Sequence, residues 1–227
     1  MKTLGLLGGM SAESTTLYYQ ELNRLVRARL GGMHSAELIV WSIDFAPMAE
    51  LQAAGDWDAA GRQLAEAAAR LEAAGAQAIL ICANTMHLVA PQIQAAIGIP
   101  VIHIADATAT AVKGHGCARP LLLATRFTME KPFYRDRLAE QGIEAAVPDE
   151  ADRDRLHAII YDELVQGAIS PASRAEVLAM IARATDCDSV IFGCTEIGLL
   201  LSPDDLDRPV IDTALVHAQA GVDFALG

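Results

Sequence analysis

The sequence predicts an α/β protein built from two similar lobes, each with a mostly parallel sheet flanked by helices. Short apolar runs rich in Leu, Ile and Val alternate with longer segments of helical period, which is typical of α/β domains. The apolar runs are nearly unbroken, so we expect parallel strands that are covered on both faces. Related motifs recur in the two halves of the chain, which indicates a second, similar lobe.

The expected elements follow from these runs. Segments such as 56–75 ("DWDAAGRQLAEAAARLEAAG") and 152–167 ("DRDRLHAIIYDELVQG") are long enough and periodic enough to be helices. The strands are expected at residues 3–8, 36–44, 76–82, 99–104, 119–125, 188–193 and 208–212.

The internal repeat sets the predicted lobes. The order "LGLLGGM", "AILICANT", "IPVIHIADATA" recurs as "PLLLATRFTM", "VIFGCTEI", "RPVIDTALVHA". We therefore predict one lobe of residues 1–113 plus 212–227 and another of residues 114–211, meeting near 113–118, where "KGHGCARP" supplies turn formers. Ligands bind outside the carboxyl ends of parallel strands, so we expect "ANT" and "CTE" to form two walls of one cleft.

Composition excludes several classes of function. The 227 residues carry a net charge of −12, and the 17 Lys and Arg are scattered, which argues against a nucleic-acid partner. The N-terminal "MKTLGLLGGM" is too short for a signal-peptide core, and no segment has the length of a membrane span, so we expect a cytoplasmic protein.

The four cysteines show neither a disulfide framework nor zinc-site spacing, and we expect free thiols and no metal. Pyridoxal phosphate needs a lysine, and none of the three lysines lies in a motif, so we expect no cofactor.

The glycine-rich segment Gly5 to Ser14, "GLLGGMSAES", follows a strand and precedes a helix. Its spacing matches neither G-x-G-x-x-G nor a P-loop. Two interpretations stay open: a tight turn with Ser11 as the helix N-cap, or a turn that also presents backbone N–H groups to an anionic ligand.

Cys194 is the main candidate for chemistry. It lies in "FGCTEIG", after an apolar strand and before an expected helix start. Backbone N–H groups and the helix dipole at such a place lower the pKa of a thiol, which suits it to acid/base catalysis. A structural cysteine is the alternative.

The expected direction of the Cys82 side chain follows from the position of its neighbour Ala83 in the repeat. Laying "ANT" over "CTE" places Ala83 on Cys194 and Cys82 on Gly193. Because successive strand residues point to opposite faces, we expect Cys82 to point away from the cleft.

Other polar residues have weaker signals. His87 either orients a polar group or packs in the core, and Asp106 and Asp212 are expected first as helix caps and second as cleft groups. Cys117 and Cys187 receive no role.

Four motifs carry a resemblance that covers essentially the whole chain. "GLLGGMSAEST", "ANTMH", "LLLATRFTM" and "FGCTEIG" occur in the order in which the aspartate/glutamate racemase family has its G-G-M, C-N-T-x-H, L-G-T and G-C-T-E segments. The chain thus resembles the cofactor-independent amino-acid racemases, in particular the bacterial subgroup with N-T-M-H and G-C-T-E-I-G.

The resemblance implies a mechanism and a set of site residues. In that family two cysteines act on opposite faces of the substrate's α-carbon, and hydrogen bonds to the substrate carboxylate stabilise the carbanion. The resemblance implies an acidic or small polar amino acid, or a dicarboxylate, as the ligand, no cofactor, and a homodimer. The residues that it assigns to the substrate site are Met10, Ser11, Gln52, Ala83, Asn84, Thr85, Thr125, Thr195 and Glu196.

Ala83 departs from the family pattern, because the family's first cysteine stands at this position. Three outcomes stay open. Cys82 serves as the second acid/base; or Cys194 works alone, as in the related single-cysteine decarboxylases; or the protein binds amino acids or dicarboxylates without catalysis.

Overall fold

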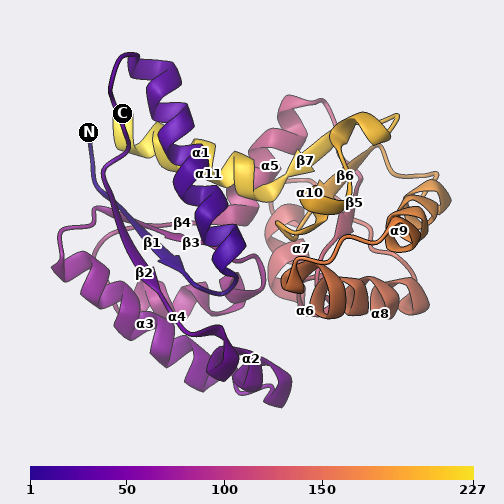
Figure 1. Cartoon of the computed structure of the whole chain (residues 1–227), viewed down its shortest axis with the longest axis horizontal. Coiled ribbons are helices and arrows are strands. Elements are labelled where there is room, and N and C mark those ends of the chain that lie inside the picture. Colours follow the sequence, from indigo (N-terminus) through magenta and orange to yellow (C-terminus); the bar gives the residue numbers. More distant parts are fainter. The chain divides into compact units, whose positions relative to one another are not determined.

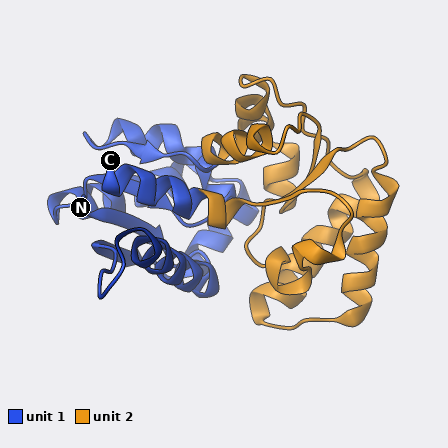
Figure 2. Ribbon diagram, turned by 90° about the horizontal axis from the view of Figure 1, so that it is seen from above, with its two compact units in different colours: residues 1–104, 217–227 blue, residues 105–216 orange.

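The computed structural model describes residues 1–227, which form two compact units (Figure 2). Unit 1 comprises residues 1–104 and 217–227, and unit 2 comprises residues 105–216. No helix combines the length and the apolar character that crossing a membrane requires.

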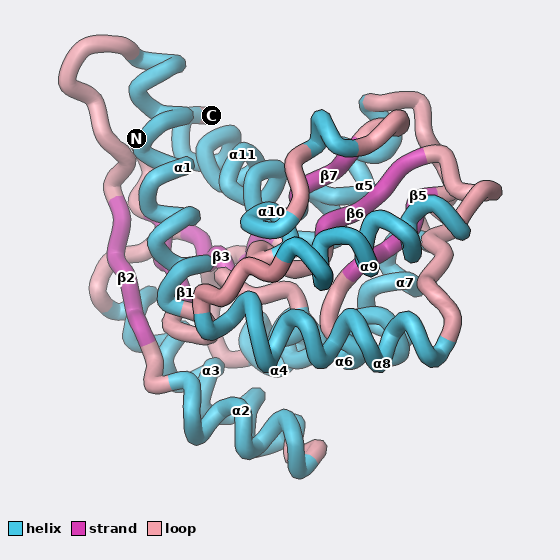
Figure 3. The backbone as a smooth tube through the Cα atoms, turned by 45° about the vertical axis from the view of Figure 1, so that its right-hand side comes forward, coloured by secondary structure: helices cyan, strands magenta, loops and turns pink.

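Unit 1 contains a four-stranded parallel sheet with the strand order β2-β1-β3-β4 (Figure 1). Helices lie on both sides of this sheet (Figures 1 and 3). Its strands are β1 (Leu4–Gly8), β2 (Leu38–Ser42), β3 (Ala78–Ile81) and β4 (Val101–Ile102). Its helices are α1 (Ala12–Leu30), α2 (Phe45–Ala54), α3 (Trp57–Ala73), α4 (Ala90–Ala95) and the larger part of α11 (Thr213–Leu226), with a 3-10 helix at Thr85–Val89.

Alternation along the strands divides the core of unit 1 between the two faces of the sheet. Leu7 and Ile81 belong to the buried cluster that α3 and α4 complete. On the other face Leu80 packs beneath α11, where a Cβ added to Gly221 would lie 2.9 Å from Leu80. Both faces of the central strands are therefore covered, as the apolar runs predict.

β2 departs from the expectation that every strand is covered on both faces. It is one of the two edge strands of its sheet, and none of its residues is fully buried. Val40 keeps 43% of its surface exposed, while Trp41 packs on the α3 side. An apolar run does not reveal by itself whether its strand ends up at an edge.

Unit 2 contains a three-stranded parallel sheet with the order β5-β6-β7. Its strands are β5 (Pro120–Leu123), β6 (Ser189–Phe192) and β7 (Val210–Asp212). Its helices are α5 (Ile104–Gly114, all but its first residue), α6 (Arg126–Glu130), α7 (Pro132–Ala139), α8 (Glu150–Ala158), α9 (Pro171–Arg183) and α10 (Ile197–Leu200), with a short 3-10 helix at Pro203–Asp205.

The helix expected at 152–167 is not a single α-helix. α8 ends at Ala158, a π-helical turn follows at Ile159–Glu163, and a 3-10 turn at Leu164–Gln166 precedes Gly167. Gly167 has φ 76°, the left-handed conformation with which helices commonly end at glycine. The π-helical turn changes the direction in which the side chains after Ala158 point.

The boundaries between the units differ from the predicted 1–113 plus 212–227 and 114–211. The chain leaves unit 1 after Ile104 and returns at His217. The reason lies in α5, which is bound to unit 2: Asp106 forms an ion pair with Arg137 at 2.7 Å. Residues 113–118 therefore connect α5 with β5 inside unit 2, and they are not the junction of the lobes.

Candidate functional site

Each unit carries a turn at the carboxyl end of a central strand, β3 in unit 1 and β6 in unit 2. The two turns correspond residue by residue. In unit 1 the Cys82 N–H donates to the Leu7 carbonyl at 3.0 Å, and in unit 2 the Gly193 N–H donates to the Leu123 carbonyl at 2.7 Å. Cys82 thus corresponds to Gly193, and the next residues, Ala83 and Cys194, correspond to each other. This is the register that the sequence repeat predicts.

Cys194 lies two residues beyond β6 and is half-buried. Its Sγ–H donates to Glu196 Oε2 at 2.9 Å, and the Thr195 hydroxyl donates to the same oxygen at 2.7 Å. Glu196 is only 4% exposed, so its carboxylate is held against the thiol away from bulk water. The thiol and the carboxylate form one proton-sharing pair.

The direction of the Cys194 pKa is opposite to the one that the helix-start argument predicts. Burial raises this pKa well above its ordinary value, and the charges of Glu196 and Asp212 raise it further. A hydrogen bond from the Glu196 backbone N–H lowers it, as expected of a helix start, but this effect is outweighed. α10 has only four residues, so its dipole is small. Cys194 therefore rests as a thiol, which is the form that donates a proton.

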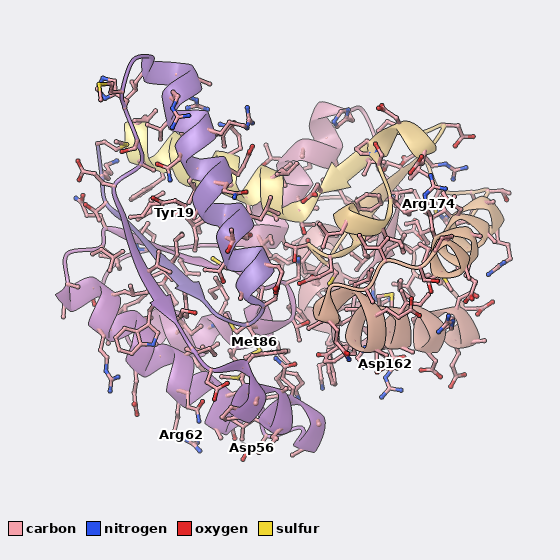
Figure 4. The ribbon with its side chains drawn as sticks, in the orientation of Figure 1. Tyr19, Asp56, Arg62, Met86, Asp162 and Arg174 are labelled. Atoms are coloured by element: carbon pink, nitrogen blue, oxygen red, sulfur yellow. The ribbon has the colours of Figure 1, made fainter.

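Tyr161 is a neighbour of this pair that no sequence motif indicates. It lies on the π-helical turn after α8, and its ring contacts His157 with centroids 4.5 Å apart. Burial raises the pKa of Tyr161 to about 12, and the negative charges of the Cys194 thiolate, when it forms, and of Glu196 add to the effect. The π-helical turn, which no sequence period announces, brings this phenol into the electrostatic field of the thiol. Figure 4 labels the adjacent Asp162, which is exposed.

Cys82 lies in the core of unit 1. It is 1% exposed, its Sγ is 3.8 Å from the Leu80 carbonyl, and burial raises the pKa of its thiol. Ala83, by contrast, is half-buried. The residue with accessible surface at this turn is thus the alanine, and Cys82 as a second acid/base would need a rearrangement of the core.

The glycine-rich turn has the tight geometry that the first interpretation predicts. Ser11 caps α1, because its Oγ accepts from the Ser14 N–H at 3.0 Å. Gly9 has φ 85°, and an added Cβ would lie 2.3 Å from the Ile43 carbonyl oxygen, so only glycine fits. Met10 is buried in the core cluster of the α3 and α4 face.

The other predicted residues of unit 1 gather around the 3-10 helix Thr85–Val89. Asn84 and Thr85 are 7% and 8% exposed, respectively. Gln52, buried on α2, donates its Nε2–H to Met86 Sδ at 3.0 Å, which ties α2 to this helix. Met86 is labelled in Figure 4, as is Asp56, which caps α3.

Thr125 and the two aspartates have structural partners in unit 2. Thr125 caps α6 by accepting from the Thr128 N–H. Asp212 caps α11 as predicted, because its Oδ1 accepts from the Ala214 N–H at 2.9 Å. The expectation of a cap at Asp106 is wrong, since this residue lies inside α5, where the Arg137 ion pair holds its carboxylate.

The predicted residues therefore form two groups, one at the strand ends of each sheet. The group of unit 1 consists of Met10, Ser11, Gln52, Ala83, Asn84 and Thr85, and that of unit 2 consists of Thr125, Cys194, Thr195 and Glu196.

Comparisons with known proteins agree on the family. The profile of the Asp/Glu/Hydantoin racemase family matches residues 7–221. The chain is 49% identical to a proposed Asp/Glu racemase from Yersinia pestis, whose crystal structure superimposes with a TM-score of 0.91 over 100% of both chains. It is 33% identical to an aspartate racemase homologue from Pyrococcus horikoshii OT3, with a TM-score of 0.87 over 100% of both chains. It is 21% identical to the broad specificity amino-acid racemase RacX of Bacillus subtilis (strain 168), over 98% of each chain. The chain belongs to the Asp/Glu/Hydantoin racemase family.

Proposed function

We propose that this protein transfers a proton at the α-carbon of an acidic or small polar amino acid without a cofactor, and that Cys194 is the principal acid/base. The observation that carries the proposal is the Cys194–Glu196 pair at the end of β6, in which a half-buried thiol donates to a buried carboxylate at 2.9 Å. A group that exchanges protons in catalysis needs a partner within hydrogen-bond reach, and the Glu196 carboxylate lies at that distance from the thiol.

In the racemase reaction the α-C–H bond breaks and its electron pair stays on carbon. The base is the Cys194 thiolate, which forms when the thiol proton passes to Glu196. By resemblance to the racemases, we assign to Asn84 and Thr85 the hydrogen bonds to the substrate carboxylate, where the negative charge of the carbanion accumulates. A water molecule, or Cys82 after a rearrangement of the core, returns a proton to the opposite face to complete the inversion, and Glu196 then releases its proton to solvent.

Ala83 favours a second candidate, an enzyme that transfers a proton at one face only. It corresponds in register to Cys194, and a methyl group transfers no proton. The raised pKa of Cys194 agrees with a thiol that waits as an acid. In a decarboxylase the bond to the carboxyl group breaks, carbon dioxide leaves, the electron pair stays on carbon, and the thiol protonates that carbon. The thiolate then regains a proton from solvent.

The test is incubation of the full chain with L- and D-amino acids in deuterated water, followed by NMR at the α-position. Exchange with inversion supports the racemase, exchange with retention supports transfer at one face, and carbon dioxide release from malonate-type acids supports the decarboxylase. Cys194→Ser should abolish turnover, while Cys117→Ser, a cysteine without an assigned role, should leave it unchanged. Binding without exchange for any amino acid, together with no carbon dioxide release from malonate-type acids, would refute both enzymatic candidates in favour of a silent binder.

The homodimer that the resemblance implies is proposed as well. Sedimentation equilibrium of the full chain should give twice the mass of 24.1 kDa.

A further inference from the structure

A buried network of two histidines and a tyrosine lies beneath the turn that carries Ala83. His87 is 1% exposed, His217 is 0% exposed and Tyr18 is 1% exposed. At this burial each ring nitrogen and the phenol need partners inside the protein. The residues come from the 3-10 helix, from α11 and from α1, so three segments far apart in the sequence meet here.

The partners of His87 determine its tautomer. Nδ1 lies 2.9 Å from the Ala83 carbonyl oxygen, and Nε2 lies 3.2 Å from the Ile104 backbone nitrogen. A carbonyl only accepts and a backbone N–H only donates, so the proton of His87 is on Nδ1 and Nε2 accepts. His87 is therefore neutral, in the tautomer that free histidine disfavours.

His217 has the opposite arrangement. Its Nε2 lies 2.7 Å from the Ile102 carbonyl oxygen, and its Nδ1 lies 2.7 Å from the Tyr18 hydroxyl. Nε2–H consequently donates to Ile102, and Nδ1 accepts from the phenol. The centroids of the His87 and His217 rings are 5.5 Å apart, and His103 approaches His87 at 4.7 Å, so charging these rings would bring like charges together.

The network connects the turn with the ends of other segments of unit 1. Ala83 is the residue that corresponds to Cys194, and Ile102 is the last residue of β4. Ile104 and His217 are the residues at which the chain leaves unit 1 and returns to it.

We infer that His87 and His217 are positioning residues: as neutral imidazoles of opposite tautomers, they fix the Ala83–Thr85 turn against β4, α1 and α11. The role in catalysis rests on the proposed function, whereas the tautomers do not. Neither imidazole touches the reacting atoms in this role. Each acts through the backbone groups that it holds.

The first experiment reads the tautomers without any substrate. The full chain is labelled with ¹⁵N-histidine, and two-dimensional NMR at neutral pH assigns the ring nitrogens, with His34→Asn as the control for an exposed histidine. The expected result is a proton on Nδ1 of His87 and on Nε2 of His217. A proton on Nε2 of His87, or a positively charged ring at either position, would overturn the inference.

The second experiment separates the two hydrogen bonds of His87. In His87→Asn the side-chain amide keeps a donor near the place of Nδ1, and in His87→Gln the amide oxygen takes the place of Nε2 and the bond to Ala83 is lost. We expect His87→Gln to raise KM about tenfold or more relative to His87→Asn, with a smaller change in kcat. Equal KM values for the two folded variants would contradict the inference.

Tyr18→Phe keeps the ring and removes only the donor to His217, which guards against variants that fail to fold. It should shift the Nδ1 resonance of His217 and raise KM as well. An unchanged Nδ1 resonance would refute the network. A wild-type protein without turnover but with the expected tautomers would refute the proposed function and leave the network standing.

Discussion

His217 should make the stability of unit 1 depend on acid. The pKa of this imidazole is lowered from 6.5 to about 3, first by burial and then by the neighbouring His87, while the bond to the Ile102 carbonyl acts in the opposite direction. The groups that face it are Tyr18 from α1, His87 from the 3-10 helix and the Ile102 carbonyl from β4. None of them carries a negative charge that would stabilise an imidazolium.

The sign follows from proton linkage. Between pH 6.5 and pH 3 the unfolded chain binds a proton at His217 and the folded chain does not, so the free energy of unfolding falls as the pH falls. The stability that the neutral His217 contributes is complete above pH 6.5. Below pH 6.5 it is lost at up to about 1.4 kcal/mol per pH unit. From pH 7 to pH 5 the expected loss from this one group is about 2 kcal/mol.

The assay is urea unfolding at pH 7 and pH 5, followed by tryptophan fluorescence. Both tryptophans, Trp41 and Trp57, belong to unit 1, so their signal reports the unit that contains His217. The matched variant is His217→Gln, whose amide keeps a donor for Ile102 but takes up no proton. The wild type should lose about 2 kcal/mol more than the variant on acidification. Parallel losses in the two proteins, or a wild type that gains stability in acid, would refute the reasoning.

Three further outcomes test the site. Glu196→Gln removes the carboxylate that raises the pKa of Cys194, so alkylation of this thiol by iodoacetamide near pH 8 should speed up about tenfold for each pH unit by which the pKa falls, and an unchanged rate would show that Glu196 does not control the thiol. Gly193→Ala should cost about 1–3 kcal/mol of stability, because the new Cβ would lie 2.8 Å from Leu122 Cδ1 and 3.0 Å from the Leu123 carbonyl, whereas Gly114→Ala, which meets no atom within 4 Å, should be neutral in thermal unfolding. Ala83→Cys should increase inversion relative to exchange with retention in deuterated water, with Ala83→Ser as the control of similar size, and no difference between the two would disprove the correspondence of residue 83 with Cys194 in function.

Much of the fold could be predicted because the apolar runs and the helical periods are local signals. All seven expected strands exist, and the repeat predicts the register in which Ala83 corresponds to Cys194. The exposed edge at β2 and the π-helical turn before Gly167 could not be predicted, because both depend on which neighbours an element acquires after folding.

The chemistry of the site was harder to predict than its location. Backbone groups at a helix start predict a lowered pKa for Cys194, but the direction of this pKa is decided by burial and by the carboxylate of Glu196. The sequence places Glu196 two residues after Cys194. It does not predict that the Glu196 side chain turns back toward the thiol. His217 pairs with Tyr18 across 199 positions, and no sequence period connects them.

The two turns differ in a way that explains why Cys82 is a poor second base. In unit 2 the position after β6 is Gly193, and an added Cβ there would lie 2.9 Å from the Cβ of Ala124. In unit 1 the residue that corresponds to Ala124 is Gly8, where an added Cβ would lie 2.5 Å from Thr15 Cγ2. In unit 1 the glycine of the pair, Gly8, is on β1 and the larger residue, Cys82, follows β3. In unit 2 the larger residue, Ala124, follows β5 and the glycine, Gly193, follows β6. Cys82 is only 1% exposed, whereas Ala83 is half-buried, so proton transfer in this turn depends on the residue that stands at Ala83.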